Sequence, residues 1–150
     1  MAKTRSVSRS CTVDAPPSAV FDLLTDPSKH PLIDGSGTVK ASLAEPGTRL
    51  AMGSTFGMNM KLGAPYKIEN TVMEFAEDKL IAWRHFGGHR WRYQLEAVDA
   101  GTKVTETFDW STSKAPFMLE LVQAPKRNAK AMEKTLDRLV AHFASAGPRI

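Results

Sequence analysis

The residues best suited to chemistry in this chain are a carboxyl, an imidazole and a phenol on alternating strand segments: Glu106, His85 and Tyr93. Glu106 falls on the inward face of its segment, where a carboxylate must either bind a proton or pair with a cation. It could therefore anchor a polar group of a ligand or act as a general acid or base. A structural ion pair with Arg9, on the neighbouring first strand, is the alternative, since buried charges are usually paired.

His85 is the second inward-facing titratable group, and its imidazole could orient a carbonyl or transfer a proton. Tyr93 could supply a single proton transfer in the same space. Glu106 lies two strands and four residues from His85, which at about 4.8 Å per strand and about 3.3 Å per residue gives roughly 16 Å. We therefore expect the two groups to touch opposite ends of one ligand and not to form a dyad.

No pattern in the chain predicts a metal or a cofactor. Cys11 is the single cysteine, and His30, His89 and His142 are scattered along the sequence, so the ligand spacings of a zinc site are missing. The run Asp34-Gly35-Ser36-Gly37 lacks the lysine and the following helix of a phosphate-binding loop. It could instead gate the mouth of a cavity.

The elements that must position these groups follow a simple order. An alternating first strand at about 4–13 precedes two short helices, one beginning at Pro16-Pro17 and one covering 28–33. Six further strands are predicted at 39–43, 56–62, 66–75, 80–86, 89–98 and 103–111. A shift of the alternation at Met73 predicts a β-bulge. After Pro125 the apolar period becomes that of a helix of about 20 residues, which ends before Gly147-Pro148.

Turn lengths set the predicted register of the aromatic strands. A three-residue turn at 87–89 places Trp83 opposite Tyr93, and a four-residue turn at 99–102 places Tyr93 opposite Phe108 and Trp91 opposite Trp110. The aromatic face is either a packed core or a cavity wall, and the methionines near it either fill gaps or let a wall repack around ligands. The side chains predicted to contact a ligand are Phe56, Met58, Met60, Ile68, Trp83, His85, Trp91, Tyr93, Glu106, Phe108, Trp110, Met118, Met132 and Leu136.

This order of elements resembles the helix-grip order of the START and polyketide cyclase/dehydrase (SRPBCC) superfamily. Local phrases that resemble polyketide cyclase/dehydrase members are Val13-Asp14-Ala15-Pro16, Val20-Phe21-Asp22, residues 30–35 and Gly101-Thr102-Lys103-Val104-Thr105. The resemblance implies an α+β fold with a seven-stranded, curved antiparallel sheet around a long C-terminal helix. It also implies a small hydrophobic ligand, lipid-like or aromatic, between sheet and helix. The alternative is an enzyme of cyclase or dehydratase type that uses the same cavity.

Composition narrows the class of protein further. The 150 residues, 42% hydrophobic and 24% charged, are typical of one globular domain over 1–150. No apolar stretch approaches the roughly 20 residues of a membrane span, and a secretory signal is not evident, so we expect a cytoplasmic monomer or homodimer.

The net charge of +4 comes largely from the two ends of the chain. Because the aromatics are not interleaved with a basic face, no nucleic-acid partner is expected. The basic stripe of the last helix could meet an acidic partner or an anionic membrane, but it is more typical of a solvated face, and we predict no stable membrane association.

Overall fold

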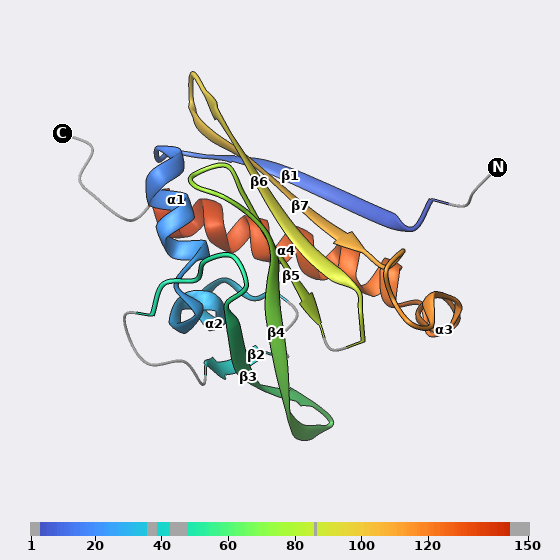
Figure 1. Ribbon diagram of the computed structural model, residues 1–150. Helices are drawn as coiled ribbons and strands as arrows, with labels where there is room; N and C mark the ends of the chain where they lie inside the picture. The colour runs from blue at the N-terminus through green and yellow to red at the C-terminus, as the bar shows by residue number, and fades with distance from the viewer. Residues whose placement is uncertain (1–3, 36–38, 43–47, 86, 145–150) are drawn as a thin grey trace.

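The computed structural model describes residues 4–35, 39–42, 48–85 and 87–144, and this part of the chain has the predicted α+β helix-grip architecture (Figure 1). The strands are β1 (Ser6–Val13), β2 (Val39–Ser42), β3 (Thr55–Leu62), β4 (Ala64–Ala76), β5 (Leu80–His85), β6 (Arg90–Val98) and β7 (Gly101–Asp109). The helices are α1 (Pro17–Leu24), α2 (His30–Ile33), α3 (Pro116–Leu121) and α4 (Ala124–Ala144), with a 3₁₀ turn at Pro27–Lys29. These seven strands form one antiparallel sheet in the order β1-β7-β6-β5-β4-β3-β2.

The long helix α4 packs one apolar stripe against the sheet and turns its charges outward, as its period predicts. Figure 1 shows it lying across one face of the sheet, beneath β1 and β7. The stripe is buried and comprises Ala129, Met132, Leu136, Leu139 and Phe143. The helix end predicted at Gly147-Pro148 lies outside the described residues.

The β-bulge predicted near Met73 is present in β4. Val72 lies opposite Trp83 on β5, and the next paired residue, Glu74, lies opposite Ala82, so β4 holds one extra residue. This residue explains why the alternation of apolar side chains shifts at this point.

The predicted register of the two aromatic hairpins is wrong by two residues at each turn. Trp83 lies opposite Trp91 and not Tyr93, and Trp91 lies opposite Phe108 and not Trp110. The first turn closes one residue earlier, ending at Gly88 with φ of 99°, a conformation that favours glycine.

The second hairpin closes on a two-residue turn before Gly101. A Cβ on this glycine would clash with the Val13 carbonyl oxygen. Only glycine therefore lets the chain pass this close to the end of β1. Because each error is an even number of residues, every aromatic side chain keeps its predicted face. The register changes only which rings are neighbours.

Candidate functional site

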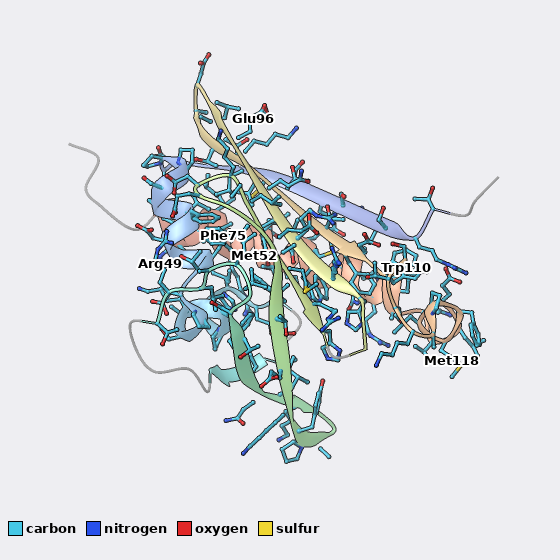
Figure 2. The ribbon with its side chains drawn as sticks, viewed as in Figure 1. Arg49, Met52, Phe75, Glu96, Trp110 and Met118 are labelled. Carbon is cyan, nitrogen blue, oxygen red and sulfur yellow. The ribbon has the colours of Figure 1, made fainter. Side chains whose placement is uncertain are left out.

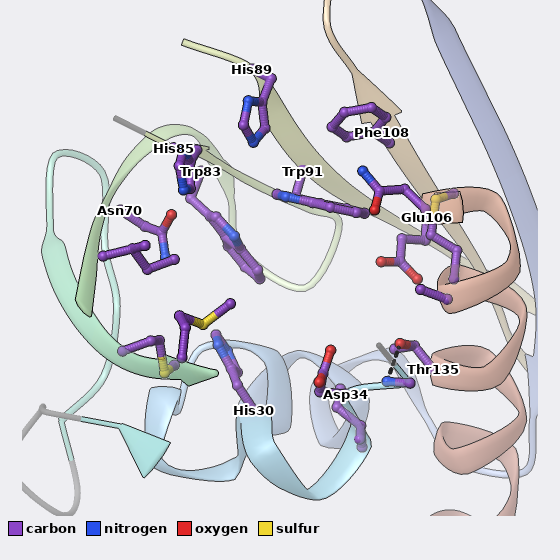
Figure 3. A pocket seen from close by; sticks show the side chains of 18 of the residues that line it. His30, Asp34, Asn70, Trp83, His85, His89, Trp91, Glu106, Phe108 and Thr135 are labelled. Atoms are coloured by element: carbon purple, nitrogen blue, oxygen red, sulfur yellow. Dashed lines mark hydrogen bonds between the residues drawn. The ribbon is translucent and has the colours of Figure 1, made fainter. Parts of the chain in front are cut away.

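A cavity of about 560 Å³ lies between the sheet, α2 and the first turns of α4 (Figure 3). Its volume is within the range of about 300–1,000 Å³ that is usual for small-molecule sites. Eleven of the fourteen side chains predicted to contact a ligand line it: Phe56, Met58, Met60, Ile68, Trp83, His85, Trp91, Tyr93, Glu106, Phe108 and Met132. Contact of these residues with a ligand stays a prediction.

Three of the predicted residues lie outside the cavity wall. Trp110 is buried behind Phe108 and Met132, and Leu136 belongs to the core beneath the sheet. Met118 lies on α3 and is 48% exposed, so its expected place in the wall is corrected. The reason is that α3, a helix of six residues, is too short to be recognised by its periodicity and turns Met118 outward.

The aromatic face is both packed and open to the cavity. Trp83 stands at its centre, with its ring centroid 5.0 Å from that of His30, 5.4 Å from Phe56 and 5.7 Å from Tyr93. These four rings, three on the sheet and His30 on α2, therefore pack against one another, and all four also border the cavity (Figure 3). Neither of the two alternatives, packed core or cavity wall, describes this face alone.

Glu106 is a buried carboxyl that borders the cavity, and Figure 3 shows it directed inward from β7. The side chain is only 3% exposed. Its Oε2 accepts a hydrogen bond from the Tyr93 hydroxyl at 2.9 Å, whereas no described residue hydrogen-bonds its Oε1. Burial, helped by the nearby Asp34 carboxylate and opposed by the Tyr93 hydrogen bond, raises the pKa of Glu106 to about 8. At neutral pH the carboxyl is therefore mainly protonated, with Oε1 unsatisfied.

The expected ion pair between Arg9 and Glu106 does not form. The two residues lie opposite each other on β1 and β7, as neighbouring strands require. The Arg9 Nε instead lies 3.6 Å from Glu133 Oε2 on the outer side of α4. A long arginine side chain can reach the surface and stay solvated, which avoids the cost of burying its charge.

Three histidines border the cavity, and they include His30 and His89, which are scattered in the sequence pattern. His30 Nε2 lies 2.8 Å from the Leu24 carbonyl oxygen, so that nitrogen carries the proton and donates. His85 and His89 stack with centroids 4.5 Å apart across the β5–β6 turn. Burial lowers the pKa of all three, that of His89 to about 4, helped by the neighbouring His85. With the correct turn, the spacing of His85 and His89 would have revealed their contact.

Asp34 and Gly35 close the cavity between α2 and α4. The Gly35 N–H donates to Thr135 Oγ1 at 2.8 Å, and the Asp34 carbonyl accepts from the Arg138 guanidinium. Ser36 and Gly37, the rest of the predicted gating loop, lie outside the described residues, so gating stays a prediction. Among the described residues, no group of three or more His, Cys, Asp or Glu side chains is placed to hold a metal ion.

The mouth of the cavity is marked by the lining residues that are exposed. These are Tyr66 on β4 and Arg127, Lys130 and Lys134 on α4. The opening therefore lies between the β3–β4 hairpin and the N-terminal half of α4, and its rim is basic on the helix side. The polar groups of the interior are those of Glu106, Asp34, Asn70, Asn128, Thr135, the Tyr93 hydroxyl and the three histidines, and the rest of its wall is apolar.

Residues 4–144 match the family model described as polyketide cyclase / dehydrase and lipid transport. The chain belongs to this family. An uncharacterized protein of Mycobacterium tuberculosis, Rv0088, is 39% identical over 144 residues, which cover 92% of this chain and 64% of that protein. The chain thus spans less than two thirds of the length of this relative. In the described part of the chain, no helix is long and apolar enough to cross a membrane.

Solved structures share the fold of this family member. A Rhodobacter sphaeroides protein superposes with a TM-score of 0.73 at 18% identity, over 95% of this chain and 94% of its own. The Aha1 dimer of Colwellia psychrerythraea gives a TM-score of 0.64 at 15% identity, over 95% and 98%. At these identities the likeness shows the helix-grip fold alone, and function must be argued from the site.

Proposed function

We propose that this family member binds a small apolar molecule, lipid-like or aromatic and polyketide-like, in the cavity between sheet and α4. The observation that carries the proposal is a space of about 560 Å³ whose walls are mainly apolar, with aromatic rings and methionine side chains among them. Apolar walls provide affinity, and a small number of placed polar groups provides orientation. We place the protein in the cytoplasm, as a monomer or homodimer, and the proposal assigns no role to a metal or a cofactor.

Glu106 supports a more specific ligand chemistry within this proposal. Its Oε1 has no hydrogen-bond partner among the described residues, and the protonated carboxyl can donate a hydrogen bond from this oxygen. A buried donor left unpaired costs about 1–3 kcal/mol, so a ligand oxygen that accepts its hydrogen bond would be favoured. Asn70 is 4% exposed and borders the cavity beside His85, its partner across β4 and β5. Its amide can orient a second polar group of the ligand.

We expect a bulky side chain at Ala131 to abolish binding of an apolar probe. Ala131 borders the cavity from α4, so Ala131→Phe puts a ring into the space the ligand needs. The control is Ala141→Phe on the exposed side of the same helix. Titration with Nile red should show at least about tenfold weaker binding for Ala131→Phe, a loss of about 1.4 kcal/mol or more in binding free energy. Ala141→Phe should bind Nile red as the wild-type protein does.

Ligand that stays bound through purification gives a second, independent measurement. Native mass spectrometry and solvent extraction of the wild-type protein should recover an apolar compound, and less of it from Ala131→Phe. If the wild-type protein carries no compound and binds no probe, the proposal is wrong.

An enzyme of cyclase or dehydratase type is the second candidate, and Glu106 is the observation that favours it. A carboxyl with its pKa raised to about 8, directed into an apolar cavity, suits a general acid or base at neutral pH. Tyr93 holds it in place, and the cavity would fold a flexible substrate. Glu106→Gln keeps the shape of the side chain, so it should remove turnover from an enzyme and leave the affinity of a binding protein within a few-fold.

A further inference from the structure

The exposed apolar side chains of this chain gather at α3. Of the eight large apolar side chains exposed in the described residues, four lie between Phe117 and Val122. Phe117 is 63% exposed and Leu121 is 74% exposed. Figure 2 shows Met118 pointing away from the body of the protein at this end, on the far side of α3 from Trp110. Such a concentration marks an interaction surface more often than single exposed residues do.

The only acidic side chain of residues 111–132, Glu120, is turned away from that surface. Its Oε2 lies 3.2 Å from Arg5 Nε and accepts a hydrogen bond from Trp110 Nε1 at 2.8 Å. The same stretch holds four cationic side chains, at positions 114, 126, 127 and 130. The outer face of α3 and the start of α4 are therefore apolar and basic together.

This surface continues into the mouth of the cavity. A second hollow, bounded by Leu121, Val122 and Lys126, shares the walls formed by Arg127 and Lys130 with the cavity itself. Leu119 on α3 also borders the cavity. A partner that covers these exposed residues of α3 and the start of α4 would thus contact the rim of the cavity mouth.

We propose that Phe117, Leu121, Val122, Lys126, Arg127 and Lys130, together the α3 surface, dock on an anionic lipid bilayer. Apolar side chains beside lysine and arginine are the combination that holds a helix at a membrane interface, where the apolar part enters the headgroup boundary and the cations meet anionic lipids. A second copy of the chain is disfavoured, because a two-fold contact would place this basic surface against itself. Docking of this kind is reversible and does not require a membrane span.

Vesicle co-sedimentation of the full chain tests the proposal. The wild-type protein should sediment with vesicles of phosphatidylcholine and phosphatidylglycerol, much less with phosphatidylcholine alone, and less as salt rises. Phe117→Asp with Leu121→Asp should weaken binding at least about tenfold, because each side chain loses its apolar burial and gains a charge of the wrong sign. Lys126→Glu should weaken it about fivefold or more.

Matched controls replace equivalent residues elsewhere on the surface. Met52→Asp removes an apolar side chain that is 62% exposed, against 63% for Phe117, and Lys103→Glu reverses an exposed charge at the start of β7. Both should bind vesicles as the wild-type protein does. The replaced residues are exposed, so circular dichroism should show all variants folded.

Three results would overturn the proposal: a wild-type protein that ignores anionic vesicles, docking variants that sediment like the wild type, or a wild-type dimer that Phe117→Asp dissociates without affecting vesicle binding. The last result would assign the surface to a second copy. All measurements are made without added ligand, so failure here leaves the proposed binding function standing, and the reverse also holds.

Discussion

Replacing Glu106 with glutamine should make the protein more stable relative to wild type as the pH rises from about 5 to about 8. The pKa of Glu106 is about 8 in the folded protein against an ordinary value of 4.5. The folded state therefore holds this proton more tightly than the unfolded state. Its contribution to stability is complete below about pH 4.5 and is lost as the pH rises to about 8. The loss is about 1.4 kcal/mol per pH unit, on the order of 3–5 kcal/mol in total.

Urea unfolding of both proteins at pH 5, 6.5 and 8 measures this difference. The free energy of unfolding of wild type must be compared with that of Glu106→Gln at each pH, because the buried histidines change stability with pH in the opposite direction. Burial lowers the pKa of His30, His85 and His89, so both proteins lose stability as the pH falls below about 6.5. Subtracting the two curves removes that effect.

The control for this experiment is Glu96→Gln, which replaces an exposed carboxylate on β6 and should change stability by less than about 0.5 kcal/mol. Parallel curves for wild type and Glu106→Gln would mean that the carboxyl is solvated or paired in solution. In that case Glu106 would not offer a ligand the unsatisfied donor on which the proposed ligand chemistry rests.

Alternation and helical period predicted most of this fold because they depend on which face of an element is buried. The predicted register was wrong by two residues, but the aromatic side chains of β5, β6 and β7 still lie on the predicted face of the sheet. Side chains two residues apart along a strand point to the same face. Eleven of the fourteen predicted side chains therefore border the cavity, although their ring-to-ring neighbours differ from those predicted. The bulge at Met73 was visible for the same reason, as a break in the alternation.

The features that the sequence did not predict depend on single contacts and not on periodicity. Turn length is decided locally, as at Gly88, and it determined that His85 stacks on His89. His30 joins the site because one ring nitrogen bonds the Leu24 carbonyl and the ring packs on Trp83. Arg9 turned to Glu133 because solvent was within reach of its long side chain. No pattern of types and spacing encodes these choices.

Two truncations on α4 should differ in a way that only an open cavity explains. Met132 is 1% exposed and Leu139 is fully buried, but only Met132 borders the cavity. Leu139→Ala leaves a new void in a packed core and should cost about 2–5 kcal/mol. Met132→Ala enlarges a space that already reaches solvent, so its cost should be smaller by at least about 1 kcal/mol.

Probe binding separates the same two variants on an independent axis. With a larger pocket, Met132→Ala should bind a bulky apolar fluorophore more tightly than the wild-type protein, while Leu139→Ala should bind it unchanged at a temperature where it stays folded. Urea unfolding and fluorescence titration provide the two measurements. If Met132→Ala loses as much stability as Leu139→Ala and binds the probe no differently, the space beside Met132 is filled in solution, and the proposed binding function fails with it.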